Sequence, residues 1–247
     1  MIRLSSCYKF WCVLIIAALS LSGCLGAREW TYPPPPDKTY VTTPGKDPIQ
    51  ATLVVLPLED LRGTEEKDEY WKVAIPLVPH GVASYDRPET VVHPEQVDEL
   101  FFDPPKDFAR ALADEIREAN IFSNVTLSES PTPPPGDYVL RGRLHSTRWE
   151  RRLTTYLLGP LGTVLWMVGL PMGETTTEVE MDLRLSPAGD PSQVLWSFAM
   201  KFNGAVNDGV YYGLEEEVQS YPVALQDALR PAIHDLVDKS KTRIIKK

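Results

Sequence analysis

Cysteine is scarce in this 247-residue chain, and its three cysteines, Cys7, Cys12 and Cys24, all lie within the first 24 residues. Residues 25–247 therefore offer no thiol for a disulfide, a cysteine nucleophile or a cysteine-based metal site. Positive charge is also in short supply, because 25 Lys and Arg stand against 34 Asp and Glu, and the formal net charge is −9. This sign is wrong for a protein that neutralises nucleic-acid phosphates, so we expect no nucleic-acid partner.

Catalytic and metal-binding motifs are lacking as well. The sequence has no Gly-x-Ser-x-Gly elbow, phosphate loop, dinucleotide-binding glycine motif or His-Glu-x-x-His. Its four histidines form no pair at helical spacing: His80, His93, His145 and His234. Asp60 and Arg62 are interpreted as a salt bridge within a turn in preference to a site at a strand end. We therefore expect no catalytic residue, metal or cofactor, and an enzyme with an unrecognised site is a competing class.

An export signal is present at the N-terminus. Arg3 and Lys9 precede an apolar run over residues 13–19, and small residues follow it, which is the order of a secretory signal. The apolar run is shorter than the roughly 20 residues that span a bilayer. The pattern predicts a secretory signal sequence and not a membrane-spanning helix.

Leu21, Ser22 and Gly23, placed directly before Cys24, resemble the lipobox of bacterial lipoproteins. The resemblance implies that residues 1–23 are a signal peptide, removed when the Cys24 thiol is acylated. Several acyl chains would anchor the protein, since each buried CH₂ contributes about 0.8 kcal/mol. Because Leu25 and not Asp follows, the resemblance further implies the periplasmic face of the outer membrane, with the inner membrane as the alternative.

The remainder divides into a tether and a domain. Residues 24–50 are rich in proline without an apolar period, which predicts an extended linker. A single domain is expected over residues 51–247. We predict strands at 52–58, through Val73, Ile75 and Leu77 at an edge, and at 122–127, 138–145, 178–185 and 193–203; helices at 103–119 and 214–236; and a loop over 79–102.

The pattern of these elements defines a fold class. The last three strands alternate apolar and polar residues, so each has one wet and one buried face. The turn at 187–191 joins the final two as an antiparallel hairpin. Two amphipathic helices on one face of a mainly antiparallel sheet make an α+β two-layer sandwich.

Three short segments suggest a family. Residues 53–60, 136–144 and 194–197 resemble the periplasmic domain of curli-secretion-channel lipoproteins and related envelope-assembly lipoproteins. The resemblance implies a domain that binds partners in the cell envelope. It does not extend to pore formation, because no equivalent of the channel's membrane-crossing hairpins is visible.

The most unusual segment is the uncharged stretch of residues 153–173. Its six Gly and Pro residues, and the strands on both sides of it, argue against a transmembrane helix. It is either a folded-back crossover that completes the core or an exposed apolar patch that contacts lipid or a protein partner. In the second case Trp166, Met167 and Leu170 are its anchors.

These features together predict a lipid-anchored, periplasmic, non-catalytic binding or assembly component of the bacterial envelope. Its partners would be the membrane, through the N-terminal anchor, and an envelope protein. A subunit of an oligomeric export or channel complex is the alternative, and the sequence leaves the oligomeric state open.

Overall fold

The structure, a computed structural model, describes residues 28–30, 32, 48–91, 100–132, 134–212 and 221–240. The predicted signal peptide, the lipobox and most of the tether lie outside these residues. The chain divides into two units. The smaller comprises residues 1–29 and 92–101, and its described part is the parallel pair β1 (Arg28–Glu29) and β6 (Leu100–Phe101). All other described elements belong to the larger unit.

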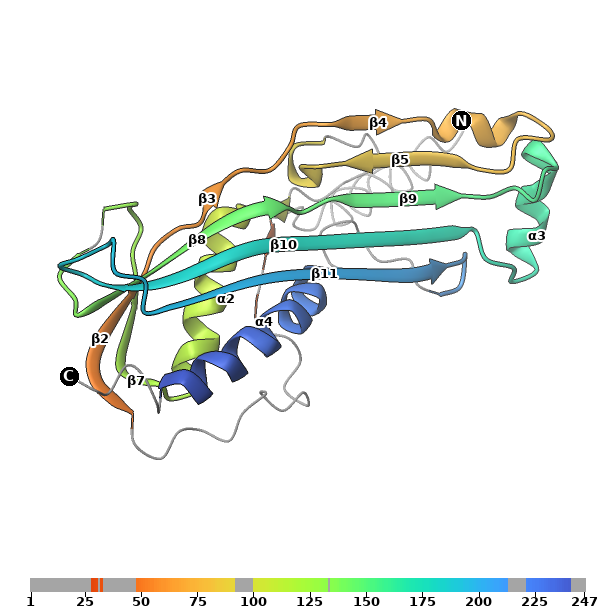
Figure 1. Ribbon diagram of the computed structural model, residues 1–247. Coiled ribbons are helices and arrows are strands. Elements are labelled where there is room, and N and C mark those ends of the chain that lie inside the picture. Colours follow the sequence, from red (N-terminus) through yellow and green to blue (C-terminus); the bar gives the residue numbers. More distant parts are fainter. Residues whose placement is uncertain are drawn as a thin grey trace, which may run out of the picture. The chain divides into compact units, whose positions relative to one another are not determined.

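Nine strands of the larger unit form one sheet, in the order β4-β5-β9-β10-β8-β2-β7, with β11 on β10 and β3 on β8 (Figure 1). Their bounds are β2 (Ile49–Val55), β3 (Glu59–Asp60), β4 (Glu66–Asp68), β5 (Gly81–Tyr85), β7 (Phe122–Leu127), β8 (Tyr138–Ser146), β9 (Trp149–Leu153), β10 (Gly173–Pro187) and β11 (Trp196–Asp208). β2 pairs in parallel with β7 and β8, and β3 with β8. The other pairings of this sheet are antiparallel, so the predicted mainly antiparallel sheet is confirmed.

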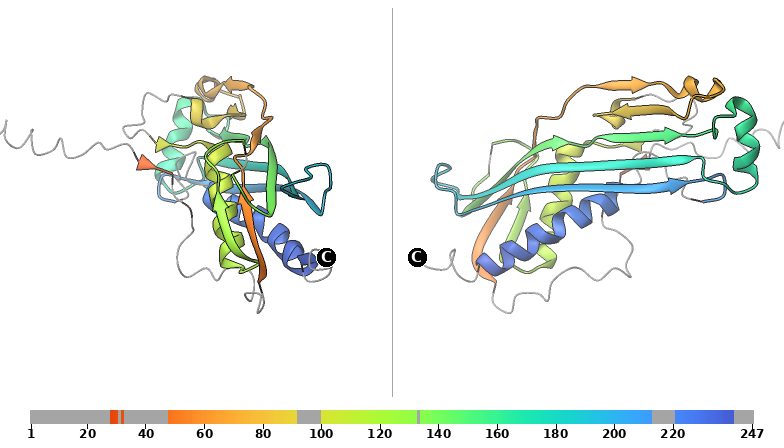
Figure 2. Two further views of the ribbon diagram at one scale, coloured as in Figure 1. Left: turned by 90° about the vertical axis from the view of Figure 1, so that its left-hand side faces the viewer. Right: turned by 45° about the vertical axis from the view of Figure 1, so that its right-hand side comes forward.

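β10 connects the two halves of this sheet. Its 15 residues span roughly 50 Å at the usual rise of a strand. Residues 173–177 of β10 pair with β9, and residues 180–187 pair with β8. β11 follows β10 over residues 173–185. One half of the sheet is covered by long helices, and the other extends beyond them (Figure 2).

Two long helices cover one face of the sheet, as predicted for the two-layer sandwich. α2 (Pro104–Glu118) packs against β7 and β2, and α4 (Tyr221–Lys239) packs against β11 and β10. Their fully buried side chains include Phe108 and Leu112 of α2 and Leu225 and Leu229 of α4. These meet buried residues of the strands, which makes the core that positions the rest of the molecule.

The N-terminus of α2 differs in detail from the simplest expectation. Asp103 stands at its N-cap but makes no side-chain capping bond. The carboxylate of Asp107 accepts a hydrogen bond from the backbone N–H of Asp103 at 2.8 Å. Here the side chain of a helical residue bonds back to the N-cap backbone, as in the second half of a capping box. The helix still begins where the sequence predicts it.

The predicted edge strand through Val73, Ile75 and Leu77 is wrong. The 3₁₀ helix η1 (Tyr70–Ala74) occupies this stretch, and Leu77 follows in a turn with a φ of 68°. Ile75 and Leu77 are exposed, so their alternation does not record one buried sheet face. The pattern misleads because these apolar side chains belong to a surface and not to the core.

The predicted loop over residues 79–102 contains a strand. β5 pairs antiparallel with both β4 and β9, and the short η2 (Pro88–Thr90) follows it. Gly81, Ala83 and Ser84 are too small to show an apolar period. The strand forms because it pairs with a neighbour on each edge, and the local sequence pattern carries no sign of those neighbours.

Part of the predicted tether contacts the domain. Trp30 is buried, with its ring centroid 5.1 Å from that of Phe102 and 6.0 Å from that of Phe108. The Tyr32 hydroxyl donates a hydrogen bond to Glu115 of α2. These two aromatic side chains therefore hold a point of the tether against the helix layer.

Candidate functional site

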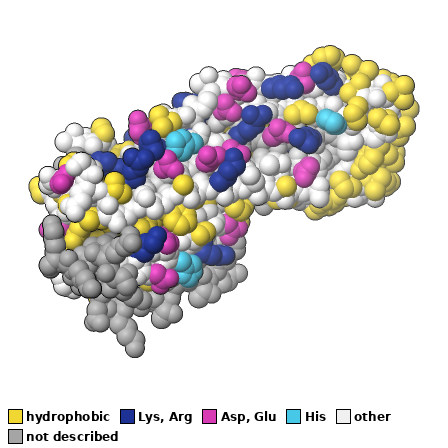
Figure 3. All heavy atoms as spheres, in the orientation of Figure 1, with side chains coloured by type: hydrophobic (Ala, Val, Ile, Leu, Met, Phe, Trp, Pro, Cys, Tyr) yellow, Lys and Arg dark blue, Asp and Glu magenta, His cyan; other side chains and the backbone are white. Residues whose placement is uncertain are grey.

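The extended half of the sheet ends in an apolar surface built from three separate chain segments (Figure 3). We call residues 71–79, 154–172 and 209–212 the apolar cap. Its exposed large apolar side chains are Trp71, Ile75, Leu77, Leu157, Leu158, Leu161, Val164, Met167, Val168, Leu170, Val210, Tyr211 and Tyr212. Lys72 is the one charged residue in these ranges, and its Nζ lies 2.8 Å from a carboxylate oxygen of Glu69.

The uncharged segment of the sequence forms the centre of this cap. It leaves β9, folds into η3 (Gly159–Gly162) and α3 (Thr163–Met167), and returns into β10. None of the α3 side chains is buried, which favours the interpretation of this segment as an exposed apolar patch. Among the described helices, none is long and apolar enough to span a membrane.

Hydrogen bonds to backbone carbonyls join residues 71–79 of the cap to residues 154–172. The N–H of Leu77 donates to the carbonyl of Leu157 at 2.9 Å, and the Thr155 hydroxyl donates to the carbonyl of Val73 at 3.1 Å. Gly162 folds so closely over Thr155 that a Cβ at residue 162 would lie 2.0 Å from the Thr155 carbonyl oxygen. Glycine is therefore required there, and the cap is a defined structure with its own internal bonding.

The polar ends of the cap aromatics are used within the cap. The indole N–H of Trp166 donates to the carbonyl of Thr154 at 2.8 Å. The Tyr156 hydroxyl donates to the carbonyl of Pro171 at 2.6 Å, and the Tyr211 hydroxyl to that of Met167 at 2.9 Å. Burial, together with the neighbouring Tyr212, raises the pKa of Tyr156, so this hydroxyl stays neutral at physiological pH. The cap thus satisfies polar groups inwardly and presents apolar surface outwardly.

Charged residues begin at the base of the cap, and two of them form a buried ion pair there. Arg151 of β9 lies 3.0 Å from Asp208 of β11, and Asp208 is almost fully buried. The Thr175 hydroxyl of β10 donates to the same carboxylate at 3.1 Å. This bridge joins three strands close to the cap, and Arg152 of β9 and Glu174 of β10 are the last charged residues of those strands before it.

The three predicted anchors occupy different environments. Met167 is 66 % exposed and Leu170 is 41 % exposed. Trp166 is half-buried and supports the segment through its indole N–H. The sequence does not identify Trp71, Leu77 and Tyr211 as part of the same surface, because strand pairing alone brings these distant segments together.

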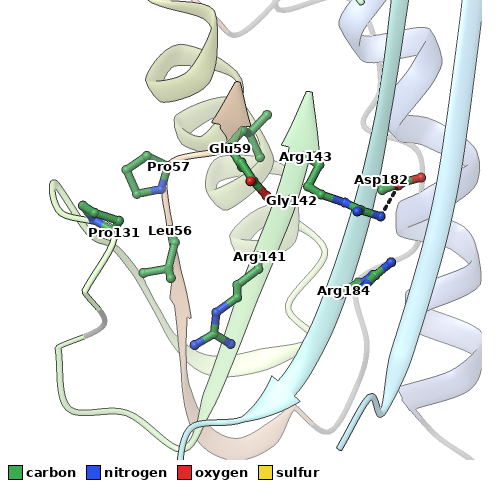
Figure 4. A pocket seen from close by; sticks show the side chains of 10 residues that line it. Leu56, Pro57, Glu59, Pro131, Arg141, Gly142, Arg143, Asp182 and Arg184 are labelled. Atoms are coloured by element: carbon green, nitrogen blue, oxygen red, sulfur yellow. Dashed lines mark hydrogen bonds and ion pairs between the residues drawn. The ribbon is translucent and has the colours of Figure 1, made fainter. Parts of the chain in front are cut away.

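A second candidate is a pocket of about 570 Å³ beside β2, β8 and β10 (Figure 4). Leu56, Pro57 and Pro131 give it an apolar wall. Its polar residues are Glu59, Arg141, Arg143, Asp182 and Arg184. The arginines alternate along their strands with buried residues, so they point to the sheet face opposite the helices.

Asp182 is the ionic centre of this pocket. It accepts a bond from Arg143 at 2.8 Å and lies 3.0 Å from Nε2 of His145. Burial alone would raise the pKa of Asp182, but the hydrogen bonds and charges of His145 and Arg143 outweigh that effect and lower it. Asp182 is therefore ionised and bound to its own neighbours across the physiological range.

The titratable residues singled out in the sequence do not converge. Within the described ranges, no group of three or more His, Cys, Asp or Glu side chains could hold a metal ion. His80 is exposed directly before β5, His234 is exposed on α4, and His93 lies outside the described residues. Asp60 and Arg62 form the predicted salt bridge at 3.0 Å, which confirms the structural interpretation of that pair.

Comparisons with known proteins give only remote likenesses. No family model matches the chain, and no curated protein sequence matches it. Protein XCC0632 from Xanthomonas campestris, of the DUF330 family, is similar with a TM-score of 0.38 and 14% identity, over 83% of this chain and 92% of that chain. Two PelC dodecamers from Paraburkholderia phytofirmans, the first a leucine-to-methionine variant, give TM-scores of 0.35 and 0.30 at 12% and 14% identity, over 77% of this chain and 93% of theirs. Such values define neither a family nor a function here.

Proposed function

We propose that this chain is a lipid-anchored component of the bacterial cell envelope that works by binding at a membrane and not by catalysis. The observation that carries the proposal is the apolar cap. In the proposed protein, acyl chains on Cys24 provide a permanent attachment at the periplasmic face of the outer membrane, and the cap provides a second contact with lipid.

The composition of the cap favours lipid as its ligand. Large exposed apolar patches on soluble surfaces mark binding sites, because their contact with water is unfavourable. Tryptophan and tyrosine at the edge of such a surface suit the boundary between headgroups and acyl chains. Trp71 and Tyr211 are exposed on the cap, as are aliphatic residues such as Leu77.

The internal hydrogen bonds of the cap favour the same ligand. Transfer of an unpaired polar group out of water costs several kcal/mol, so about one such group would offset the gain from a buried leucine. Tyr156, Trp166 and Tyr211 bond to backbone carbonyls of the cap itself. A protein partner would be recognised through outward hydrogen-bonding groups as well as apolar ones, and these aromatics turn theirs inward.

The lipid contact is testable in the full lipidated chain. Met167→Cys, labelled with bimane, is reconstituted into phosphatidylglycerol–phosphatidylethanolamine vesicles that contain nitroxide lipids. Ser192→Cys, exposed in the turn between β10 and β11 at the other end of the sheet, is the matched control. We expect strong quenching at residue 167 and little at residue 192. Equal quenching at both positions, or protection of residue 167 by a co-purified protein, would contradict the lipid contact.

The anchor is tested separately by mass spectrometry of the chain from a bacterial host. We expect residues 1–23 to be absent and the Cys24 sulfur to carry acyl chains. A chain with its leader intact or with a bare Cys24 thiol would reject the lipoprotein part of the proposal and leave the cap experiment valid.

A further inference from the structure

The pocket beside β8 and β10 carries a like-charged pair at a fixed register. Arg141 of β8 lies directly opposite Arg184 of β10 in the antiparallel ladder. Directly opposed side chains on one sheet face have Cβ atoms about 4.5–5.5 Å apart, and like charges at such positions are destabilising. Two arginine side chains therefore start from adjacent positions on one face of the sheet, although their guanidinium groups point in different directions (Figure 4).

Acidic residues of the described chain do not neutralise this pair. Arg141 donates to the hydroxyl of Ser186 at 3.0 Å and makes no ion pair among the described residues. Arg184 is exposed and has neither an ion pair nor a hydrogen bond within the described ranges. Asp182 is bound to Arg143 and His145, and Glu59 lies on another strand of the pocket.

Arg143, in the same pocket, has a hydrogen-bond donor without an acceptor. Its Nη2 bonds to Asp182, but its Nε is buried and has no hydrogen-bond partner. A buried donor without a partner is uncommon and costs roughly 1–3 kcal/mol in general. The three guanidinium groups thus supply more cationic donors than the surrounding side chains accept.

The wall next to the arginines is apolar. Leu56 packs with Val54 and Val139 in a small cluster on this face of the sheet, and Pro57 and Pro131 continue the wall (Figure 4). A volume of about 570 Å³ lies within the usual range of small-molecule sites. The pocket combines a cationic side with an apolar side at the scale of a small ligand.

We propose that this pocket binds a small anionic amphiphile, whose phosphate or carboxylate head lies between Arg141 and Arg184 and whose apolar part lies on Leu56 and Pro57. The planar guanidinium group matches the oxygens of phosphate and carboxylate in two-point hydrogen bonds. An anion at this position supplies the negative charge that these two arginines lack and accepts hydrogen bonds that the described residues leave open. This site is distinct from the apolar cap and does not depend on the function proposed for it.

The test is calorimetric titration of the full chain in dodecyl maltoside. The probes are hexyl phosphate, inorganic phosphate and hexanol. We expect saturable binding of hexyl phosphate, at least about tenfold weaker binding of inorganic phosphate, and none of hexanol. Equal affinity for both phosphates would overturn the amphiphile in favour of a plain anion site.

Variants place the binding at the arginine pair. R141Q/R184Q is expected to weaken hexyl phosphate at least about tenfold, since a hydrogen bond to a charged group is worth roughly that factor. R230Q removes the same kind of charge from the exposed face of α4 and is expected to bind like the unaltered chain. A thermal midpoint for each variant confirms folding, and the ligand-free R184Q variant should melt no lower than the unaltered chain. Undiminished binding by R141Q/R184Q, or equal losses in R230Q, would reject the site.

Discussion

The guanidinium of Arg62 lies 2.6 Å from a carboxylate oxygen of Glu89, and both side chains are largely buried. Arg62 also pairs with Asp60 at 3.0 Å and donates to the hydroxyl of Thr147 at 2.7 Å. Thr147 stands at the break between β8 and β9, and its carbonyl accepts a bond from Tyr221 at the start of α4. One buried cation therefore joins the helix-covered half of the sheet to its extension.

Replacement of this cation should be costly. Arg62→Met would leave Asp60 and Glu89 without their common partner in a buried site. Loss of one member of a buried ion pair typically lowers the free energy of unfolding by about 3–5 kcal/mol. Urea denaturation measures the change, and Arg117→Gln, which removes an exposed pair with Asp114, should cost less than about 1 kcal/mol. Equal and small losses would show that the Arg62 network does not stabilise the fold.

Acid should weaken the same network through Asp60. Burial alone would raise the pKa of Asp60, but the hydrogen bonds and charge of Arg62, with a contribution from Arg87, outweigh it and hold the pKa below its ordinary 3.8. The stability from the ionised carboxylate is therefore complete above pH 3.8 and is lost as pH falls through the lower folded-state value.

The matching variant is Asp60→Asn. We expect it to unfold at lower urea concentration than the unaltered chain at pH 7, with the difference narrowing below about pH 4. A difference that stays constant from pH 7 to pH 2.5 would contradict a role for the charge of Asp60.

Ionised Glu115 should lower the stability of the fold, whereas ionised Asp60 raises it. Burial raises the pKa of this α2 carboxyl, and Glu118 and Asp114 add to the rise, while the Tyr32 hydrogen bond and Arg230 oppose it. Because the folded state disfavours the charged form, Glu115 destabilises the protein above its raised pKa and has no such effect below pH 4.5. Glu115→Gln, which still accepts the Tyr32 bond, should raise the free energy of unfolding at pH 7 but not at pH 4. A lower stability at pH 7 would refute this reasoning.

Leu77 allows the backbone and the surface of the cap to be tested separately. Its φ of 68° is unfavourable for a residue with a Cβ, and its side chain is 81 % exposed. Leu77→Gly should therefore be more stable to urea than Leu77→Ala, by about 1 kcal/mol, because only glycine relieves the strain. Both variants should lower nitroxide quenching of the bimane at residue 167. Equal stabilities would mean that Leu77 is not strained.

Sequence patterns locate the regular elements well where burial is one-sided. Phe108, Leu112 and Ile116 recur at helical spacing, and α2 begins and ends within a residue or two of its prediction. β8 likewise follows from strict alternation, and so does β10 from residue 178 on, but β10 begins at Gly173, five residues before its prediction. Ala83 and Ser84 of β5 give no such signal, because their place depends on pairing with β9 and not on their own apolar character.

The candidate sites are predictable only in part for a related reason. The absence of charge over residues 153–173 marks the centre of the cap, but Trp71 and Tyr211 join it only through the order of the strands. Alternation places Arg141 and Arg184 on an outer face, yet their direct opposition depends on the register of β8 and β10. That register shifts between Glu180 and Met181, and no local pattern indicates such a shift.

The unbroken course of β10 has a mechanical consequence. Tension between the cap and the helix layer would run along this strand, at right angles to its hydrogen bonds with β11, so that these bonds would resist together as a group. A displacement of one end of β10 would therefore move the other end as well, because one continuous strand connects them. A molecule held at both ends would thus transmit a pulling force along β10 from one attachment to the other.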